Sequence, residues 1–368
     1  MKKLIFALLI SAATYSQDLQ KDYQLRLEPV WSRVADALGE PGSVESAEIS
    51  PNNRLVVSGT KYDYALVVWR MSDGYELWRT YHPAEIERAG FSSDSKYVAA
   101  CSEDFKTTIY DAETGKVVET ITHNQGVDGL VWSNTSMLLA TGEEYSYDKK
   151  GNKQGFIDIY DMDKRENVAH INYDSTINEL FFTQDDAYLV AIGHAGIKVY
   201  DTKTWKVEKE FFQDEDVIFT AGGFSPDGKW IIAAQNKPNK GDIHLIDWKK
   251  GKIKRTFNHV GRKTETVAFH PSGDYVAFTG HSSFIHIYRL ADILKYKQDR
   301  LQPAVKIWAS DHAEYINFNR DGSFMVSAHQ NGLIKLWVWM GEDPLLNDKR
   351  HKGIKKDQIS PETSKAKD

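Results

Sequence analysis

The sequence has little of what disulfides, membrane spans and the common catalytic sites require. It contains one cysteine, Cys101, so no internal disulfide can form. The apolar stretch at residues 4–13 is well short of the roughly 20 residues that a spanning helix needs. The chain also lacks H-E-x-x-H, a cysteine pair and G-x-S-x-G, which are the usual zinc and nucleophile signatures. These absences favour a protein that is not an enzyme.

Clustered positive charge is missing too. The chain has 46 Lys and Arg against 52 Asp and Glu, a formal charge of −6. This balance argues against nucleic acid and anionic membranes as partners. Residues 223–229, GFSPDGK, have the glycine and lysine spacing of a phosphate-binding loop. Because Trp230 stands where that loop needs Ser or Thr and a strand is expected next, we predict a hairpin turn instead.

The sequence does contain a repeat of about forty residues, clearest at residues 85–121. Each unit has short runs of alternating apolar residues separated by clusters of Ser, Asp and Gly, which is typical of antiparallel strands joined by hairpins. The first turn recurs at intervals of 42, 41, 50, 42, 45 and 49 residues. Its seven starting positions are Ser50, Ser92, Ser133, Thr183, Ser225, His270 and Asn319.

Two ladders of large apolar residues stay in phase with these turns. The first lies five residues after each turn begins, at Leu55, Tyr97, Leu138, Tyr188, Trp230, Tyr275 and Phe324. The second marks the end of each third strand, at Trp69, Tyr110, Tyr160, Tyr200, Ile246, Tyr288 and Trp337. Seven units in register indicate a repeat architecture. Cys101 falls where other units mostly have small residues, so we interpret it as a packing residue rather than a reactive thiol.

From residue 44 to residue 339 the chain resembles the WD-repeat family of β-propellers. Third-strand segments such as DYALVVW and NGLIKLW carry the resemblance. The family's Trp-Asp pair is intact in none of the seven units. The family also has a buried network of His, Ser, Asp and Trp, and its Asp is present here in two units only, as Asp63 and Asp104. His82, His123 and His259 stand where the family has a structural histidine, and the resemblance implies that role here.

The periodicity predicts an all-β fold, a seven-bladed β-propeller of four-stranded antiparallel blades. The last unit has no fourth strand of its own after Trp337. Propellers of the resembled family often close by lending an N-terminal strand to the final blade, which removes an exposed edge. We therefore expect a segment between Leu25 and Leu38 to supply the outer strand beside residues 333–339, although Ala35 and Ala37 are also compatible with a short helix.

Both ends of the chain differ in composition from the repeats. Residues 1–16 combine a basic start, an apolar stretch and small residues before Gln17, the layout of a bacterial secretory signal peptide. The domain prediction is thus a signal peptide at 1–16, a propeller at 17–346 and a disordered Lys-rich tail at 347–368. We expect an exported protein, periplasmic or secreted, that is a monomer without a membrane span.

Three insertions interrupt the regular spacing. They occupy residues 143–155, 236–241 and 291–302, and the last has the Leu and Ile spacing of a short helix. All three are compatible with plain solvated loops. The first also supports a sharper hypothesis, a partner-binding loop, because loops on a rigid scaffold often carry function and Tyr is favoured in interfaces. Its candidate contact residues are Tyr145, Tyr147, Lys149 and Lys150.

The candidate binding site is a ring at the mouth of the central channel. Five residues before each turn stand Glu45, Glu87, Asp128, Asn178, Thr220, Glu265 and Glu314. Five of the seven are acidic, whereas 52 acidic residues in 368 would place about one there by chance. In the resembled family this position, near the start of each inner strand, faces the channel entrance. The alternative is that these side chains cap nearby amides or face solvent.

Two classes of function remain open from the sequence. The favoured one is a non-enzymatic scaffold that binds a protein or peptide through the loop-rich face and the acidic channel mouth. The alternative is a small-ligand or enzymatic propeller with a cation at that mouth. Oxygen-only ligands suit Ca²⁺ better than zinc, so calcium is the cofactor that this alternative implies, and the scaffold needs none.

Overall fold

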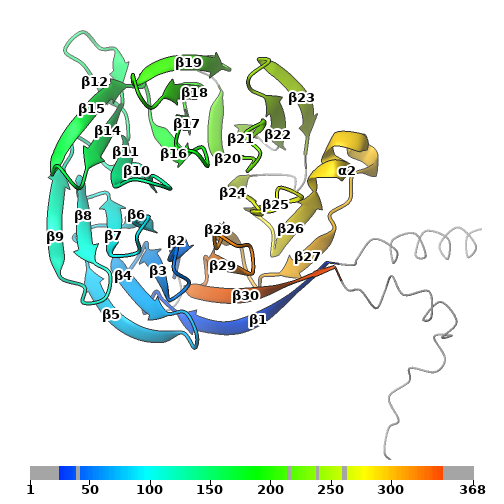
Figure 1. The fold of residues 1–368 in the computed structure, drawn as a ribbon, viewed down its shortest axis with the longest axis horizontal. Helices are drawn as coiled ribbons and strands as arrows, with labels where there is room; N and C mark the ends of the chain where they lie inside the picture. The colour runs from blue at the N-terminus through cyan, green and yellow to red at the C-terminus, as the bar shows by residue number, and fades with distance from the viewer. Residues whose placement is uncertain (1–24, 39–41, 214–216, 238–239, 259–262, 343–368) are drawn as a thin grey trace, which may run out of the picture. The chain divides into compact units, whose positions relative to one another are not determined.

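Seven four-stranded antiparallel sheets stand around a central axis in the computed structural model, and they form a β-propeller (Figure 1). The structure describes residues 25–38, 42–213, 217–237, 240–258 and 263–342. The chain divides into two units, and Glu28–Trp339 is the propeller unit. Leu25–Leu27 and Met340–Glu342 are the described residues of the other unit. The predicted seven-bladed all-β fold is confirmed.

Blades one to four run in order along the chain, each from its inner to its outer strand. Blade one has strands β2 (Val44–Ile49), β3 (Leu55–Thr60), β4 (Ala65–Arg70) and β5 (Tyr75–Tyr81). Blade two has β6 (Ile86–Phe91), β7 (Tyr97–Ser102), β8 (Lys106–Asp111) and β9 (Val117–Thr122). Blade three has β10 (Val127–Trp132), β11 (Leu138–Glu143), β14 (Phe156–Asp161) and β15 (Glu166–Asn172). Blade four has β16 (Ile177–Phe182), β17 (Tyr188–Gly193), β18 (Gly196–Asp201) and β19 (Lys206–Phe211).

The remaining blades follow the same order until the last. Blade five has β20 (Ile218–Phe224), β21 (Trp230–Lys237), β22 (Lys240–Asp247) and β23 (Lys252–Phe257). Blade six has β24 (Thr264–Phe269), β25 (Tyr275–Gly280), β26 (Phe284–Arg289) and β27 (Val305–Trp308). Blade seven has β28 (Ala313–Phe318), β29 (Phe324–His329), β30 (Leu333–Glu342) and β1 (Leu25–Val34).

The core lies between the blades. Strand β3 is buried at every position because each face of its blade packs on a neighbour, whereas every residue of the outer strand β5 is exposed or half-buried. One apolar cluster joins Val44 and Ala47 of blade one to Val326 and Ala328 of blade seven. The second sequence ladder, Trp69 to Trp337, is buried throughout, and so is Cys101. A blade cannot bury both apolar faces alone, and the repeat solves this by stacking.

The recurring turns also join neighbouring blades. In the first turn the Ser50 hydroxyl accepts a hydrogen bond from the Leu55 amide at 2.9 Å, which closes the hairpin. The next residue but one, Asn52, donates its backbone N–H to the Ser95 hydroxyl of blade two at 3.1 Å. Asn319 in turn donates to the Asn53 side chain at 3.0 Å, which links blade seven to blade one. The turn chemistry that reveals the repeat therefore also connects the blades at this end of the molecule.

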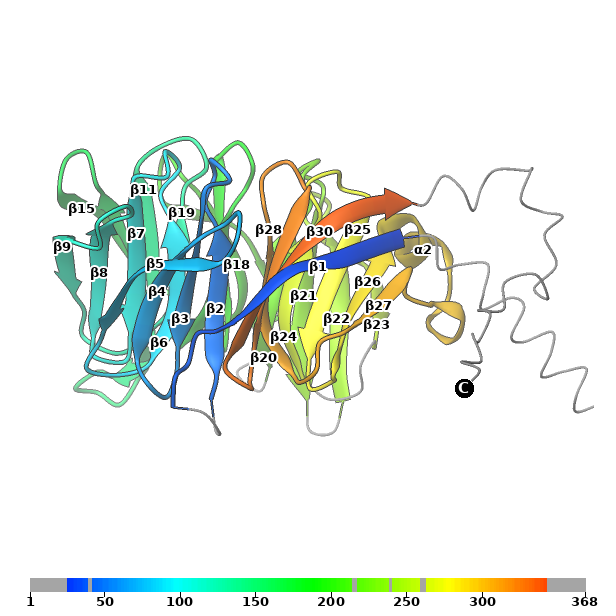
Figure 2. The same ribbon diagram turned by 90° about the horizontal axis from the view of Figure 1, so that it is seen from below.

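The ring closes through β1, as the sequence predicts. Strand β1 lies beside β30 in blade seven (Figure 2), and strand order β1-β30-β29-β28 completes the sheet. The Trp31 indole donates to the Met71 carbonyl of blade one at 2.7 Å. Immediately after the strand, the Ala35 amide donates to the Gly332 carbonyl of blade seven at 2.9 Å. The short helix that Ala35 and Ala37 would also permit does not form, because β1 gains a strand partner.

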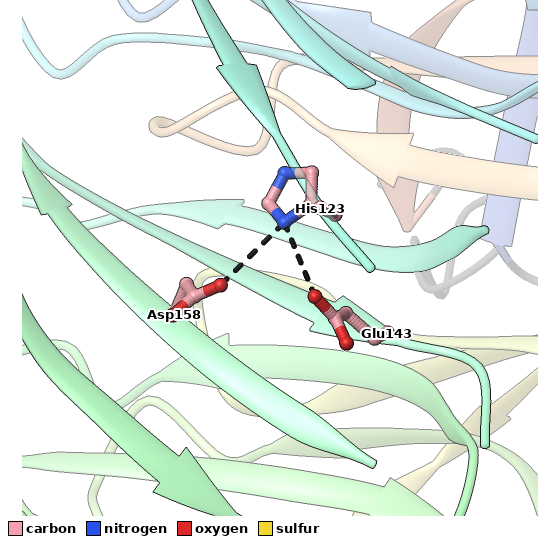
Figure 3. Close-up of side chains that lie close together, drawn as sticks. All are labelled: His123, Glu143 and Asp158. Carbon is pink, nitrogen blue, oxygen red and sulfur yellow. Dashed lines mark ion pairs between the residues drawn. The ribbon is translucent and has the colours of Figure 1, made fainter. Parts of the chain in front are cut away.

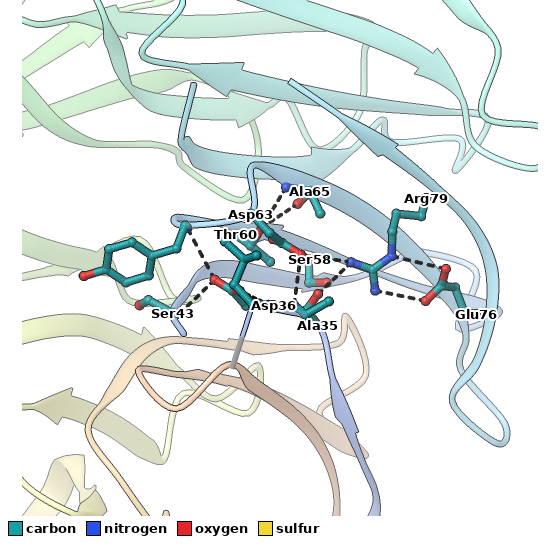
Figure 4. A network of polar contacts seen from close by, with 12 residues as sticks. Ala35, Asp36, Ser43, Ser58, Thr60, Asp63, Ala65, Glu76 and Arg79 are labelled. Atoms are coloured by element: carbon teal, nitrogen blue, oxygen red, sulfur yellow. Dashed lines mark hydrogen bonds and ion pairs between the residues drawn. The ribbon is translucent and has the colours of Figure 1, made fainter. Parts of the chain in front are cut away.

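A buried polar network fixes the segment that follows β1 to blade one (Figure 4). Asp36 accepts hydrogen bonds from the amides of Ser43 at 3.1 Å and Tyr62 at 3.3 Å. Arg79 donates to the Ala35 carbonyl at 2.8 Å and pairs with Asp63 at 3.4 Å. One short stretch of chain thus contacts both the last blade and the first.

The three insertions take different forms. The first contains the two-stranded hairpin β12 (Ser146–Tyr147) and β13 (Lys153–Gln154), and the second lengthens the β21–β22 hairpin. The third contains helix α2 (Leu290–Lys295) and the 3-10 turn η1 (Gln298–Arg300), which confirms its helical spacing. Residues 225–228 form the predicted hairpin turn before β21.

The predicted signal peptide at 1–16, the predicted tail at 347–368 and His259 lie outside the described residues. Within the described part of the chain, no helix has the length and apolar character needed to cross a membrane.

Candidate functional site

The seven ring positions come together at one end of the channel. They line a single cavity of about 410 Å³, together with Lys61, Arg88, His194, Asn236 and Lys263. Each ring residue lies on an innermost strand, β2, β6, β10, β16, β20, β24 or β28, and these strands surround the axis (Figure 1). We call the cavity the acidic mouth.

A β-bulge in every inner strand places these side chains. The pairing of β6 with β7 skips from Ile86 to Arg88, so Glu87 has no partner across the ladder. The same skip leaves out Glu45, Asp128, Asn178, Thr220 and Glu314 in their strands, and Glu265 together with Thr266 in β24. A bulge turns its extra residue out of the regular alternation. Seven bulges at the same level therefore make a ring of side chains.

The ring has an acidic arc and a neutral arc. The five carboxylates stand on consecutive blades, from six through seven and one to three, whereas Asn178 and Thr220 occupy blades four and five. Asn178 donates to the Phe219 carbonyl at 2.6 Å, and Thr220 donates to the Thr264 carbonyl at 2.7 Å. Each of these two side chains thus joins its blade to the next one through a backbone carbonyl, which differs from the amide capping that the sequence left open.

Burial and mutual repulsion disfavour ionisation of several carboxylates. Burial, the Asp128 carboxylate and the Glu45 carboxylate raise the pKa of Glu87 to about 9. Burial and Glu144 raise the pKa of Asp128 to about 6. Burial, Glu265 and Glu45 raise the pKa of Glu314 to about 8. Two carboxylates about 8 Å apart in an effective dielectric of about 20 repel by roughly 2 kcal/mol, so the mouth favours a positive charge between them.

Basic side chains at the rim neutralise part of this charge. Lys61 pairs with Glu85 at 2.9 Å, and Lys263 pairs with Glu265 at 2.8 Å. The His281 imidazole lies 3.0 Å from the other Glu265 oxygen and stacks on His312. Glu45 instead accepts a hydrogen bond from the Ser43 hydroxyl at 2.7 Å. The side of the mouth formed by blades two and three is therefore the more strongly acidic one.

On that side a third carboxylate joins the ring. Oxygens of Glu87, Glu103 and Asp128 all lie within 4.8 Å of one another, a spacing that a single cation can bridge. Burial, Glu144 and Asp128 raise the pKa of Glu103 to about 7. A Cβ on Gly126 would stand 2.4 Å from a Glu103 oxygen, so the absence of a side chain there lets Glu103 approach. Glu103 does not line the cavity itself, and the count from the turns does not find this neighbour of the ring.

Arg88 forms the floor of the mouth. Its guanidinium lies 3.8 Å from a Glu179 oxygen of blade four and 5.0 Å from the centre of the Tyr315 ring of blade seven. Glu179 and Tyr315 line a second cavity of about 470 Å³, which does not include Arg88. Burial raises the pKa of Glu179 to about 7, and the positive charge of Arg88 offsets only part of this effect. Side chains from three blades thus meet between the two cavities. The sequence signal, an Arg directly after the ring position, occurs in one unit alone.

The candidate contact loop of blade three is exposed at its tip. The Tyr145 and Tyr147 rings pack edge to face at 5.5 Å, and the Lys153 ammonium lies 5.1 Å from the Tyr145 ring centre. Lys149 and Lys150 are exposed in the turn between β12 and β13. The amide of Tyr145 donates to the Thr176 hydroxyl at 3.1 Å, which anchors the base of the hairpin on blade four. That this loop contacts a partner stays a prediction.

Comparisons with known proteins find distant relatives among the subunits of larger complexes. No protein-family model matches the chain. It is 23% identical over 288 residues to eukaryotic translation initiation factor 3 subunit I of Schizosaccharomyces pombe, which covers 70% of this chain and 83% of the relative. The same subunit of Neosartorya fischeri is 23% identical over 289 residues, with equal coverage. The target of rapamycin complex subunit wat1 of S. pombe is 23% identical over 201 residues, 53% of this chain and 60% of that protein. The chain is a seven-bladed propeller that is similar in sequence to these subunits of larger complexes.

Proposed function

We propose that this propeller is a protein-interaction scaffold, and that the acidic mouth binds a Lys or Arg side chain of its partner. The observation that carries the proposal is the arc of five carboxylates on consecutive blades around one cavity of about 410 Å³. A long cationic side chain fits such a site because its charge can enter a narrow mouth on an apolar stem. The exposed Tyr145–Tyr147 hairpin would add contact area nearby.

The names of the relatives support the general class. Translation initiation factor 3 subunit I and wat1 are both named as subunits of multi-protein assemblies. A propeller with similar blades and an acidic channel mouth is suited to the same general use, protein binding. The chemistry of the mouth makes the proposal specific, because it selects a basic segment of the partner.

The test is calorimetry at pH 8 with Arg-containing peptides and with matched peptides in which citrulline replaces Arg. We expect binding of the Arg peptides alone. Glu45→Gln/Glu87→Gln/Glu314→Gln should weaken it at least tenfold. The matched control is Glu113→Gln/Glu166→Gln/Glu208→Gln, which removes the same charge from exposed positions outside the ring and should bind normally. Equal binding by the two triple variants would falsify the site.

A cation site is the second candidate function, and the Glu87, Glu103 and Asp128 cluster favours it. Three carboxylates at this spacing provide hard oxygen ligands, which suit Ca²⁺. Thermal melts of the protein with and without Ca²⁺ at about 1 mM distinguish the cation site from the peptide site. Mg²⁺ at the same concentration is the control for ionic strength. A calcium-specific rise in Tm that Glu103→Gln abolishes supports the cation site. An unchanged Tm removes it and leaves the peptide site standing.

We also infer export, with residues 1–16 as a cleaved signal peptide and residues 347–368 as a tail beyond the propeller. This inference rests on the sequence of the two ends alone. N-terminal sequencing of protein recovered from an expressing bacterium should give Gln17 as the first residue. Recovery of the intact N-terminus from the cell envelope contradicts export, and size-exclusion chromatography with light scattering checks the expected monomer.

A further inference from the structure

A second cluster of ligand-type side chains lies between blades two and three, away from the channel ring. It consists of His123, which follows β9, Glu143 at the end of β11 and Asp158 in β14 (Figure 3). All three residues are buried, and one ligand atom from each lies within 4.8 Å of the other two. The close-up shows both carboxylates directed at the same imidazole nitrogen. We infer that these residues form a binding site for a first-row divalent transition metal of the zinc type.

The distances fit metal ligands better than hydrogen bonds. His123 Nδ1 lies 3.6 Å from Glu143 Oε1 and 3.5 Å from Asp158 Oδ2. Among the described residues Nδ1 has no hydrogen-bond partner, and neither has Glu143 Oε2. Zinc ligand bonds of about 2.0–2.2 Å in tetrahedral geometry place neighbouring ligand atoms about 3.4 Å apart. Both carboxylates therefore already lie at nearly the distance from Nδ1 that two ligands of one metal have from each other.

Each of these side chains is also held by an outer partner. His123 Nε2 lies 3.0 Å from the Thr107 hydroxyl, so a proton on Nε2 leaves the Nδ1 lone pair facing the carboxylates. Glu143 Oε1 accepts from the Asn124 amide at 3.1 Å, and Asp158 Oδ1 lies 2.7 Å from His170 Nδ1. Metal-binding histidines and carboxylates are commonly oriented by such second contacts. Two buried carboxylates also need compensating charge, which a divalent cation supplies with a neutral imidazole.

Blade three alone has this combination of residues. The positions equivalent to Glu143 in the other blades are Thr60, Ser102, Gly193, Gln235, Gly280 and His329. The positions equivalent to Asp158 are Val67, Thr108, Lys198, His244, His286 and Lys335. His82, the counterpart of His123 one blade earlier, has a purely structural partner, the Tyr110 hydroxyl at 2.8 Å. The other six blades thus fold without a carboxylate at either position. The two carboxylates of blade three are therefore not required for folding of a blade.

The test measures zinc in the full-length protein. The protein is stripped with chelator in mild denaturant, refolded with excess Zn²⁺ and dialysed, because the site is closed apart from the half-exposed His170 beside it. We expect one zinc per chain by mass spectrometry in the wild type. Glu87→Gln/Asp128→Asn, which removes the metal-like cluster at the mouth, should retain it. Glu143→Gln/Asp158→Asn should retain less than a tenth, and circular dichroism shows whether that variant folds.

Nitrogen NMR of the wild type gives a second readout that does not depend on a variant. Zinc should shift the His123 Nδ1 resonance and leave Nε2 as the protonated nitrogen. If the refolded wild type retains no zinc, the inference is wrong, and His123 is an imidazolium paired with two carboxylates. Zinc retained equally by Glu143→Gln/Asp158→Asn likewise overturns the assignment. Replacement of zinc by Co²⁺ with the absorption spectrum of tetrahedral cobalt would support it.

Discussion

Glu87 lies at the point of the mouth where burial and repulsion act most strongly on one side chain. Its pKa is raised to about 9, first by burial and then by Asp128 and Glu45. The folded state therefore binds a proton that the unfolded state releases above about pH 4.5. For a raised carboxyl pKa, stability is greatest at low pH and falls as the pH rises toward the folded value.

Glu87→Gln tests this directly because glutamine mimics the protonated acid. We expect equal stability of wild type and variant near pH 5, and a variant more stable by about 1–3 kcal/mol at pH 8. Urea unfolding of both proteins at both pH values measures this difference in stability. Glu113→Gln, at a side chain that is 74% exposed, is the control and should leave the pH dependence unchanged. A Glu87→Gln protein that is less stable at pH 8 contradicts the raised pKa.

Arg88 is the residue on which the channel floor depends. Its side chain is 15% exposed and that of Glu179 is 10% exposed, so removing one partner leaves the other charge buried. We expect Arg88→Met to cost about 3–5 kcal/mol and Arg88→Met/Glu179→Gln to recover part of that loss. Chemical unfolding of both single variants and the double variant gives the coupling energy. Strictly additive effects would show that the two side chains do not interact.

At the scale of elements, strand β1 is distant in sequence from the three strands β28, β29 and β30 that complete its blade. Trp31 is 7% exposed and contributes both packing and an indole hydrogen bond to Met71 of blade one. We expect Trp31→Ala to cost about 3–5 kcal/mol. Because β1 completes a closed ring, the melt should remain a single transition at lower Tm.

The neighbouring residue Val30 provides the matched control for that strand. Val30 is 42% exposed, and Val30→Ala should change Tm by a fraction of the Trp31→Ala effect. Differential scanning calorimetry of both variants measures the outcome. A separate low-temperature transition in Trp31→Ala would mean that β1 detaches alone and does not hold the ring together.

For the whole molecule, the acidic mouth should bind cations more tightly as the pH rises. Asp128, Glu103, Glu314 and Glu87 have raised pKa values of about 6, 7, 8 and 9, so they ionise one after another between pH 5.5 and 9.5 or so. We expect affinity for an Arg-containing peptide to increase about tenfold from pH 6 to pH 8.5. Binding should also release protons.

Calorimetry in two buffers of different ionisation enthalpy counts those protons. Affinity should fall with salt, since exposed charges are screened over about 8 Å at physiological ionic strength. The control peptide with citrulline should show neither effect. An affinity that is constant across this pH range would mean that the carboxylates of the mouth take no part in binding.

Periodicity and turn chemistry determined much of this molecule without a structure. The seven turns and the two ladders of large apolar residues predict the number of blades because each blade must repeat the same local pattern to bury its faces. The missing last strand predicts the closure by β1. Counting back from the turns even finds the ring positions, because strands of equal length place equivalent residues at equal height.

Tertiary structure alone decided the chemistry within that frame. The bulge that turns Glu87 into the channel leaves no mark in the sequence, and neither does the bond that takes Asn178 to the next blade. Arg88 at the mouth and Glu103 beside the ring are placed by contacts between residues on different strands and blades. His123 occupies a repeat position whose counterpart in blade one, His82, is structural. The two carboxylates beside His123 belong to Glu143 and Asp158, which lie 20 and 35 residues further along the chain. Local patterns fix strands and turns because those depend on near neighbours, whereas burial, pKa values and ligand geometry depend on which blades meet.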